Sequence, residues 1–324
     1  NRAALARRAL RPRFLVDVST CDLSGTLLGA RLAAPLGVAP MAYHRLVHPD
    51  GEVATARAAG AAGALLVVSP FASRSIEDIA AAASGPVWLQ LYWLHRREAL
   101  VDLVARAEAA GYGAIVLTVD TPRVGRRLRD IRHGFALPDG VAAVNLPAEV
   151  MATAHQHAGG GSALQRHSRE QFDPSLSWTD LAWLRGRTSL PLVLKGLVTA
   201  EDARLAVAHG ADAVIVSNHG GRQLDHAVST VDALPEVVAA VAGACPVLVD
   251  GGFRTGTEVL VALALGARAV LLGRPVLWGL ACAGADGAGA VLRTVVEELE
   301  DAMVLSGRPR LADVDSSLVR SVGA

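Results

Sequence analysis

The sequence predicts an α/β protein of the (β/α)8, or TIM-barrel, class. Short apolar segments rich in Val, Leu and Ile recur eight times along the 324 residues. Ala-rich segments with helical periodicity separate most of them, at the spacing of single βα units, and a polar residue, Gly or Pro ends each apolar segment. Continuous apolar segments of this kind are typical of strands covered on both faces, and eight βα units close into a barrel.

The strands are predicted, in chain order, at residues 36–40, 64–69, 87–92, 114–120, 191–196, 213–218, 246–251 and 269–274. Helices are predicted at 51–63, 97–111, 199–210 and 255–266, because each segment has a helical period and ends in Gly. A doubly wound open sheet is the alternative, which the count of eight strands disfavours because such sheets usually have about five or six.

One interval is much longer than a βα unit. Residues 121–186 separate the fourth strand from the fifth and contain TPRVGRRLRD and then HQHAGGGSAL. Loops after barrel strands lie on the active-site face, so we expect this insertion to form a lid there. Residues 1–324 are predicted to form a single domain.

Composition excludes several classes of function. Lys plus Arg and Asp plus Glu both total 31, and this balance argues against nucleic acid or an anionic membrane as the main partner. No apolar segment is long enough to span a bilayer, and the basic start lacks the apolar core of a secretory signal. The three cysteines, Cys21, Cys245 and Cys282, show neither metal-site nor disulfide spacing, so we predict no metal and a reducing, cytoplasmic location.

Polar residues gather where the predicted strands end, which is the catalytic face of this fold. DGGFRTG, residues 250–256, and LLGRP, residues 271–275, follow the last two strands. Their glycines let backbone N–H groups approach an anion, and Arg254 and Arg274 can add charge-assisted hydrogen bonds. The two loops predict a phosphate site without saying which ligand carries the phosphate.

A general base is predicted in SNHGGRQLD, residues 217–225. His219 lies just past the sixth strand, where imidazole can remove a proton near neutral pH. Arg222 beside it suits a substrate carboxylate, and Asp120 can fix the tautomer of the histidine. Lys195 ends an apolar strand and needs an anionic partner; from the residues alone it could form a Schiff base or balance a negative cofactor.

The motifs VDTPRVGRR, LKGLVTAEDARLAVAHGAD, SNHGGRQLD and DGGFRTGTEV resemble the FMN-dependent 2-hydroxy acid dehydrogenase and oxidase family, whose members include glycolate, lactate and mandelate enzymes. The resemblance runs from about Arg11 to Gly307. It implies that FMN is reduced while an (S)-2-hydroxy acid becomes the 2-oxo acid, and that oxygen or another acceptor then reoxidises FMN. It also implies a homotetramer.

The resemblance assigns roles residue by residue. His219 is the base, Asp120 its partner, Arg222 and Arg127 the carboxylate clamp, and Tyr92 a hydrogen-bonding partner of the substrate. Lys195 stabilises the reduced cofactor, which removes the Schiff-base interpretation. The cofactor-binding residues that it implies are Pro40, Met41, Ala42, Ser69, Gln90, Thr118, Lys195, Ser217, Asp250, Gly252, Arg254, Gly273 and Arg274.

Two departures from the family pattern are visible. This sequence starts after the N-terminal segment that members usually carry, so we expect either that the sequence is truncated or that the site is more open, and Pro70 and Phe71 replace a more usual Ser- and Trp-like pair. APMAYHRLVHPDGE, WLQLYW and DIRHGFALP look closest to actinobacterial hydroxymandelate oxidases. With Tyr43 and Phe71 near the mouth, we expect an aromatic substrate such as mandelate or 4-hydroxymandelate.

Other functions stay open at this point. Within the family, a lactate or glycolate oxidase or a quinone-linked dehydrogenase would carry the same motifs. Another FMN barrel, similar to isopentenyl diphosphate isomerase, would keep the phosphate loops but would not need the carboxylate clamp. A barrel that binds a ligand without catalysis would not need the full set of polar residues at the strand ends.

Overall fold

Eight parallel strands form a closed barrel in the computed structural model, which describes residues 1–147 and 163–322. Each strand pairs with the next along the chain, and the last pairs with the first. The barrel strands are β4 (Leu36–Val38), β5 (Leu65–Val68), β6 (Val87–Leu91), β7 (Ile115–Thr118), β8 (Leu192–Leu197), β9 (Ala213–Val216), β10 (Val247–Asp250) and β11 (Ala269–Leu272). All eight predicted strands, and with them the predicted fold, are confirmed.

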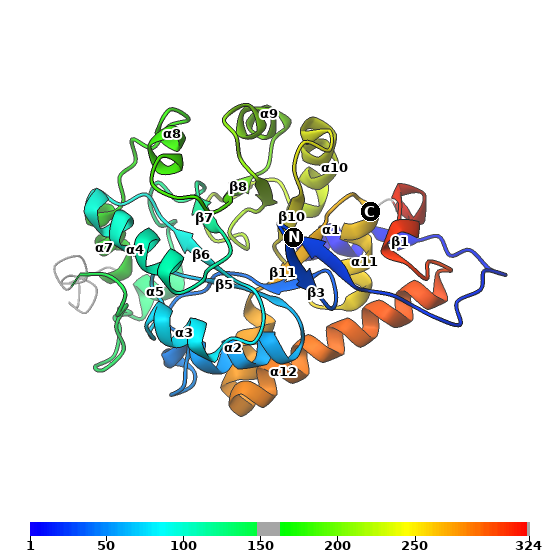
Figure 1. Ribbon diagram of the computed structural model, residues 1–324, viewed down its shortest axis with the longest axis horizontal. Coiled ribbons are helices and arrows are strands. Elements are labelled where there is room, and N and C mark those ends of the chain that lie inside the picture. The colour runs from blue at the N-terminus through cyan, green and yellow to red at the C-terminus, as the bar shows by residue number, and fades with distance from the viewer. Residues whose placement is uncertain (148–162, 323–324) are drawn as a thin grey trace.

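The barrel is covered by helices on its outer face. They are α2 (Glu52–Ala61), α3 (Ile76–Ala82), α4 (Arg97–Ala109), α8 (Asp180–Arg185), α9 (Ala200–Ala208), α10 (Thr230–Val241), α11 (Gly256–Ala264) and α12 (Arg274–Leu305). Figure 1 shows α2, α3 and α12 on one side of the strands and α8, α9 and α10 on the opposite side. The four predicted helices match α2, α4, α9 and α11, and the side chains of Thr199 and Thr255 cap α9 and α11 as their position suggests.

Successive side chains of each barrel strand point to opposite faces, so the buried residues form two clusters. Val67, Trp88, Val116, Val193, Ile215, Leu248 and Leu271 belong to a separate buried cluster of strand residues. The strand residues between them, such as Leu66, Leu117 and Leu194, belong to the larger cluster that includes the helices. This arrangement fills the barrel with side chains, so that ligands can bind only at its mouth.

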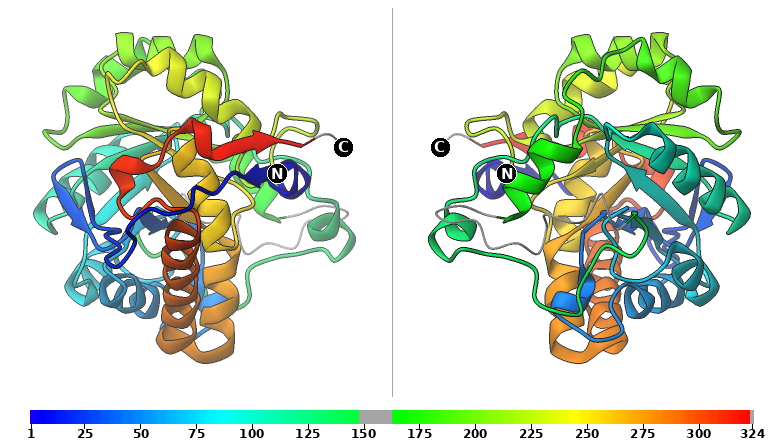
Figure 2. Two further views of the ribbon diagram at one scale, coloured as in Figure 1. Left: turned by 90° about the vertical axis from the view of Figure 1, so that its right-hand side faces the viewer. Right: turned by 90° about the vertical axis from the view of Figure 1, so that its left-hand side faces the viewer.

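Short elements close the ends of the molecule. They are α1 (Arg2–Ala6), β1 (Arg8–Leu10), β2 (Gly25–Leu27), β3 (Ala30–Leu32), the 3-10 helices η1 (His44–Leu46), η2 (Leu311–Asp313) and η3 (Ser316–Leu318), and β12 (Val319–Ser321). Because β1 pairs with β12, the two ends of the chain lie side by side (Figure 2).

The expectation that no segment is long enough to span a bilayer needs correction, because helix α12 is long and apolar enough, by length and composition alone, to cross a membrane. It is bent at Ala283 and Gly284, and packs against α2 and α11. At Gly256 the backbone of α12 comes so close that a Cβ would lie 2.0 Å from the amide nitrogen of Leu299. Helix α12 is therefore packed as part of the protein core.

The insertion between β7 and β8 contains α5 (Leu128–Arg132) and α7 (Ala163–Gln171), followed by α8. Its residues Phe135, His167 and Phe172 line the main cavity, so the insertion covers the predicted face. The Gly- and His-rich segment HQHAGGGSAL lies largely outside the described residues. Whether the insertion moves as a lid stays a prediction.

Candidate active site

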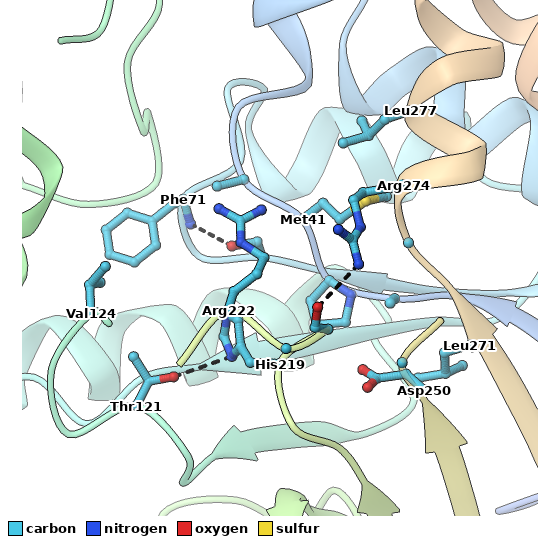
Figure 3. Close-up of a pocket in the computed structure, with 18 of the residues that line it drawn as sticks. Met41, Phe71, Thr121, Val124, His219, Arg222, Asp250, Leu271, Arg274 and Leu277 are labelled. Carbon is cyan, nitrogen blue, oxygen red and sulfur yellow. Dashed lines mark hydrogen bonds between the residues drawn. The ribbon is translucent and has the colours of Figure 1, made fainter. Parts of the chain in front are cut away.

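A cavity of about 570 Å³ opens where the barrel strands end, and its walls come from the loops that follow them (Figure 3). Sixteen of the predicted site residues line it: Pro40, Met41, Ala42, Tyr43, Ser69, Phe71, Tyr92, Arg127, Lys195, His219, Arg222, Asp250, Gly252, Arg254, Gly273 and Arg274. Gln90, Thr118, Asp120 and Ser217 do not line it. Thr118 lines a smaller cavity of about 380 Å³ beside β7 and β8 instead.

One end of the cavity is built to bind an anion. Gly251 and Gly252 have φ values of 103° and 94°, which few other residues adopt, and both turn the backbone at the end of β10. Helix α12 begins at Arg274 without a side-chain cap, and although Pro275 has no N–H and Val276 N donates to Gly273 O, the positive end of the helix dipole lies at this end of the cavity. Burial and then the charges of Arg222 and Arg254 lower the pKa of Arg274, as expected where cations gather.

A buried ion pair lies at the floor of the cavity. The Lys195 ammonium is 3.2 Å from Asp250 Oδ2 and donates a hydrogen bond to Ser217 Oγ at 2.9 Å. Burial alone would lower the pKa of Lys195, but Asp250 and Asp120 reverse the effect and raise it. The anionic partner that the sequence required is therefore Asp250, and Lys195 stays charged.

A bulge in β8 orients this lysine. The register with β9 shifts between Lys195 and Leu197, and Gly196 between them has a φ of 117°. A Cβ at Gly196 would lie 2.6 Å from the Cβ of Asp120. Only a glycine at position 196 allows β8, which carries Lys195, to approach Asp120 this closely.

Polar atoms without partners point to a bound polar group. Among the described residues, Gln90 Nε2 and Asp250 Oδ1 are buried and make no hydrogen bond. Such orphaned groups are rare in native proteins unless a ligand or water satisfies them. Together with Lys195 and the anion-binding end, they fit a cofactor that combines a polar ring edge with one phosphate, as FMN does.

The predicted base and its acidic partner are in contact. His219 Nδ1 lies 2.9 Å from Asp120 Oδ1, and Thr121 Oγ1 lies 2.7 Å from the same oxygen and 3.3 Å from His219 Nδ1. Burial would favour the neutral form of Asp120, yet Lys195 and the hydrogen bond with His219 outweigh it and lower the pKa of this carboxyl. An ionised Asp120 accepts a hydrogen bond from the Nδ1–H group, which keeps the proton on Nδ1 and leaves Nε2 as the basic nitrogen.

Two arginines face the cavity near this base. Arg222 extends into the open space toward Phe71 (Figure 3) and has no hydrogen-bond partner among the described residues. Burial and then the charge of Arg127 lower the pKa of Arg222, although a guanidinium remains charged. The neighbouring Arg126 is exposed and lines neither cavity. The structure therefore brings Arg127, and not Arg126, to the position beside Arg222.

Aromatic rings form one side of the cavity, and we call Tyr43, Phe71, Tyr92, His167 and Phe172 the aromatic wall. The ring of Phe71 lies 5.6 to 6.2 Å, between centroids, from each of the other four. Tyr92 also stacks on Phe172 at 4.8 Å. Burial raises the pKa of Tyr92 to about 12, although Lys195 opposes the shift. The phenol therefore remains a hydrogen-bond donor at neutral pH.

Several cavity residues were not predicted from the sequence. Thr121 follows Asp120 directly, and its hydroxyl could have been proposed from that adjacency. His167 and Phe172 come from the end of the insertion, and Asn1 from the start of the chain. No local pattern marks these three, because only the packing of distant segments brings them to the cavity.

Comparison with known proteins agrees with this geometry. The sequence profile of the FMN-dependent dehydrogenase family matches residues 1–321. The peroxisomal (S)-2-hydroxy-acid oxidase GLO4 of Oryza sativa subsp. japonica is 51% identical over 323 residues, covering 100% of this chain and 87% of that protein. The 4-hydroxymandelate oxidase of Amycolatopsis orientalis is 51% identical over 307 residues, covering 95% and 85%.

A solved structure extends the comparison to three dimensions. The crystal structure of mandelate oxidase with (S)-4-hydroxymandelic acid is 48% identical and superposes with a TM-score of 0.94, covering 98% of this chain and 88% of that chain.

Proposed function

The chain belongs to the FMN-dependent dehydrogenase family, and from this premise we propose that it oxidises an aromatic (S)-2-hydroxy acid and passes the electrons to oxygen. That it is an FMN-dependent enzyme acting on 2-hydroxy acids follows from the relatives it matches along its whole length. The aromatic substrate, the acceptor and the residue roles are the proposal. The observation that carries it is the cavity, in which an anion-binding end, a His–Asp pair, two arginines and an aromatic wall converge.

The residues present would hold FMN in a defined way. The phosphate would bind Gly252, Arg254, Gly273, Arg274 and the start of α12, while Asp250 and Ser217 with Lys195 would hold its polar groups. The side-chain amide of Gln90, which has no partner in the structure, would donate a hydrogen bond to the FMN ring. When bound, FMN would supply the acceptor for the two electrons of the Cα–H bond that breaks as the 2-hydroxy acid becomes the 2-oxo acid.

The protein groups would then bind the substrate and remove its proton. Arg222 and Arg127 bind the carboxylate, and Tyr92 donates a hydrogen bond to the substrate. Nε2 of His219 takes the hydroxyl proton, while Asp120 and Thr121 hold Nδ1 and stabilise the charge that the ring gains. Lys195 keeps a positive charge next to the place where negative charge accumulates.

Loss of one phosphate-binding arginine tests the cofactor assignment. We expect Arg274→Ala to weaken FMN binding by about 1.5–3 kcal/mol, the usual contribution of a charge-assisted hydrogen bond. Titration of the apoprotein with FMN, followed by fluorescence, measures this. Arg268→Ala is the matched control, because Arg268 lies at the other end of β11 and should not affect binding. Equal affinities in the two variants would remove Arg274 from the site, and a released cofactor with the mass of FAD would contradict FMN.

Substrate preference tests the aromatic proposal. An aryl ring buried against the aromatic wall should gain about 1.5–3 kcal/mol over a methyl group. We therefore expect (S)-mandelate or 4-hydroxymandelate to exceed lactate and glycolate in kcat/KM by at least about tenfold. Phe71→Ala should lower kcat/KM for mandelate and leave that for lactate nearly unchanged, which makes lactate the internal control. A parent enzyme that prefers lactate or glycolate would place it with those oxidases of the family.

Three further features remain proposals. Stoichiometric hydrogen peroxide during turnover would identify oxygen as the acceptor, and reduction of a quinone without peroxide would identify a dehydrogenase.

A homotetramer can be tested by light scattering of the purified protein. The cytoplasmic location is proposed from the cysteine pattern, and the three cysteines are free thiols in the structure.

A further inference from the structure

The segment that carries His219 has an unusual backbone. His219, Gly220 and Gly221 have φ values of 56°, 67° and 74°, so three consecutive residues are left-handed. A residue with a side chain rarely adopts this conformation, and it persists only where the surroundings enforce it. The hydrogen bond to Asp120 fixes one ring nitrogen but does not fix the backbone from which the ring extends.

The side chain of Asn218 adds to the bonds that hold this turn, in which Gly221 N also donates to the Asn218 carbonyl at 2.9 Å and His219 N donates to Ser217 Oγ at 3.1 Å. Asn218 is only 9% exposed, and its side-chain amide makes four hydrogen bonds. Oδ1 accepts from Gly221 N at 3.1 Å and from Asn1 Nδ2 at 2.8 Å, while Nδ2 donates to Val228 O at 3.1 Å and to Asn1 Oδ1 at 2.9 Å. A backbone N–H can only donate and a carbonyl can only accept, so Gly221 and Val228 define the orientation of the amide. Its bonds span the left-handed turn and anchor it at both ends.

Asn1 extends the network to the anion-binding end of the cavity. Its Oδ1 also accepts from the backbone of Thr230 at 3.1 Å, near the start of α10. A Cβ at Gly252 would lie 2.8 Å from the Cβ of Asn1, and Arg2 donates to Gly252 O at 2.7 Å. The reciprocal pair of amides therefore joins the loop of the base to the loop after β10.

We propose that Asn218, paired with Asn1, is a positioning residue that holds the left-handed turn of His219 and so directs Nε2 of the base at the substrate. The inference rests on the proposed function, because it assumes that His219 is the base. Neither asparagine needs to touch the substrate. Loss of their bonds should let the turn relax and displace the imidazole, and small misplacements of a reacting group reduce rates strongly.

The test separates positioning from folding. In the FMN-loaded enzyme, we expect Asn218→Ala to lower the anaerobic rate of flavin reduction at saturating mandelate by about tenfold or more. Flavin content and the Kd for benzoylformate, the 2-oxo acid of mandelate, should stay within about twofold, because Arg222 and Arg127 are intact. Asn218→Asp has the same shape and keeps only the accepted bonds, so it serves if the Ala variant folds poorly.

Two further variants complete the experiment. Asn1→Ala should reproduce the loss of rate, and adding it to Asn218→Ala should cost little more, because the two residues act as a pair. Tyr112→Phe is the control for destabilisation, since it removes one buried hydrogen bond, to Ile76 O, from a residue that lines neither cavity. It should lower Tm and leave the rate unchanged.

The outcomes distinguish a failure of the positioning role of Asn218 from a failure of the assignment of His219 as the base. A parental rate in both Asn218 variants, beside an inactive His219→Ala, overturns the positioning role and leaves the base assignment in place. Parallel losses of flavin content, benzoylformate affinity and rate also overturn it, because they indicate a structural role. Parental rates in the Asn218 variants and in His219→Ala overturn the base assignment and the inference with it.

Discussion

Replacing His219 by alanine should leave FMN bound and slow its reduction by the substrate by about 10²-fold or more, the usual consequence of losing a general base. The side chain contacts Asp120 and Thr121 and lines the cavity, but it has no part in the anion-binding end of the site. The visible flavin spectrum should therefore be unchanged. Rapid mixing of the anaerobic enzyme with (S)-mandelate measures the rate.

A matched histidine controls for nonspecific effects. His209 follows α9 and stacks on Trp178 with ring centroids 5.6 Å apart, and it lines neither cavity. His209→Ala should reduce flavin at the parental rate. Near-parental reduction in His219→Ala would remove this residue from the role of base, and loss of flavin in that variant would show that it holds the cofactor instead.

Replacing Arg222 by lysine should weaken binding of 2-oxo acids although the charge is kept. A guanidinium can bind both carboxylate oxygens, whereas an ammonium acts as a single point charge. Each lost charge-assisted hydrogen bond should cost about 1.5–3 kcal/mol, so Kd should rise by roughly one to two orders of magnitude. Spectral titration of the oxidised enzyme with benzoylformate measures the Kd.

The insertion provides the control for this prediction. Arg126 carries the same side chain next to Arg127 but is exposed and lines neither cavity, so Arg126→Lys should not alter the Kd. Arg127→Lys should behave as Arg222→Lys does. If Arg222→Lys bound benzoylformate as tightly as the parent, the carboxylate would have to bind elsewhere in the cavity.

The arrangement of cations and rings suggests how one cavity can serve both ligands. Burial and then the charges of Arg222 and Arg254 lower the pKa of Arg274, while burial and then the charge of Arg127 lower the pKa of Arg222, and such a cluster of cations favours bound anions. A phosphate at the start of α12 and a carboxylate beside Arg127 would supply two separate negative charges. The aromatic wall lines the same cavity and would contact a side chain on the substrate.

Sequence identity alone does not separate the candidate substrates. The 4-hydroxymandelate oxidase and the plant 2-hydroxy-acid oxidase are both 51% identical to this chain, and an L-lactate oxidase of Nostoc is 48% identical. The residues that contact the shared carboxylate and hydroxyl are expected in all of them. Discrimination must therefore come from the few residues that contact the substrate side chain, and the aromatic wall is the best candidate.

The sequence by itself determined the barrel and most of the polar residues that lie at its mouth. Eight apolar segments at βα spacing allow a parallel barrel, and in that fold all strands end on one face. For this reason the positions of Lys195, His219, Arg222 and the two Gly–Arg loops could be predicted from their place after each strand. The strand ends were predicted one or two residues too long at several points, because the last residues bend away to form the loops of the site.

Only the tertiary structure decided which distant segments complete the cavity. Arg126 and Arg127 are adjacent in an irregular loop, where no period specifies direction, and packing alone exposes one and turns the other inward. His167 and Phe172 contact Phe71 although about a hundred residues of chain separate them, and Asn1 contacts Asn218 although 217 positions separate them. A strand fixes the direction of its own side chains through its period of two, whereas contacts between loops depend on how the complete barrel brings its connections together.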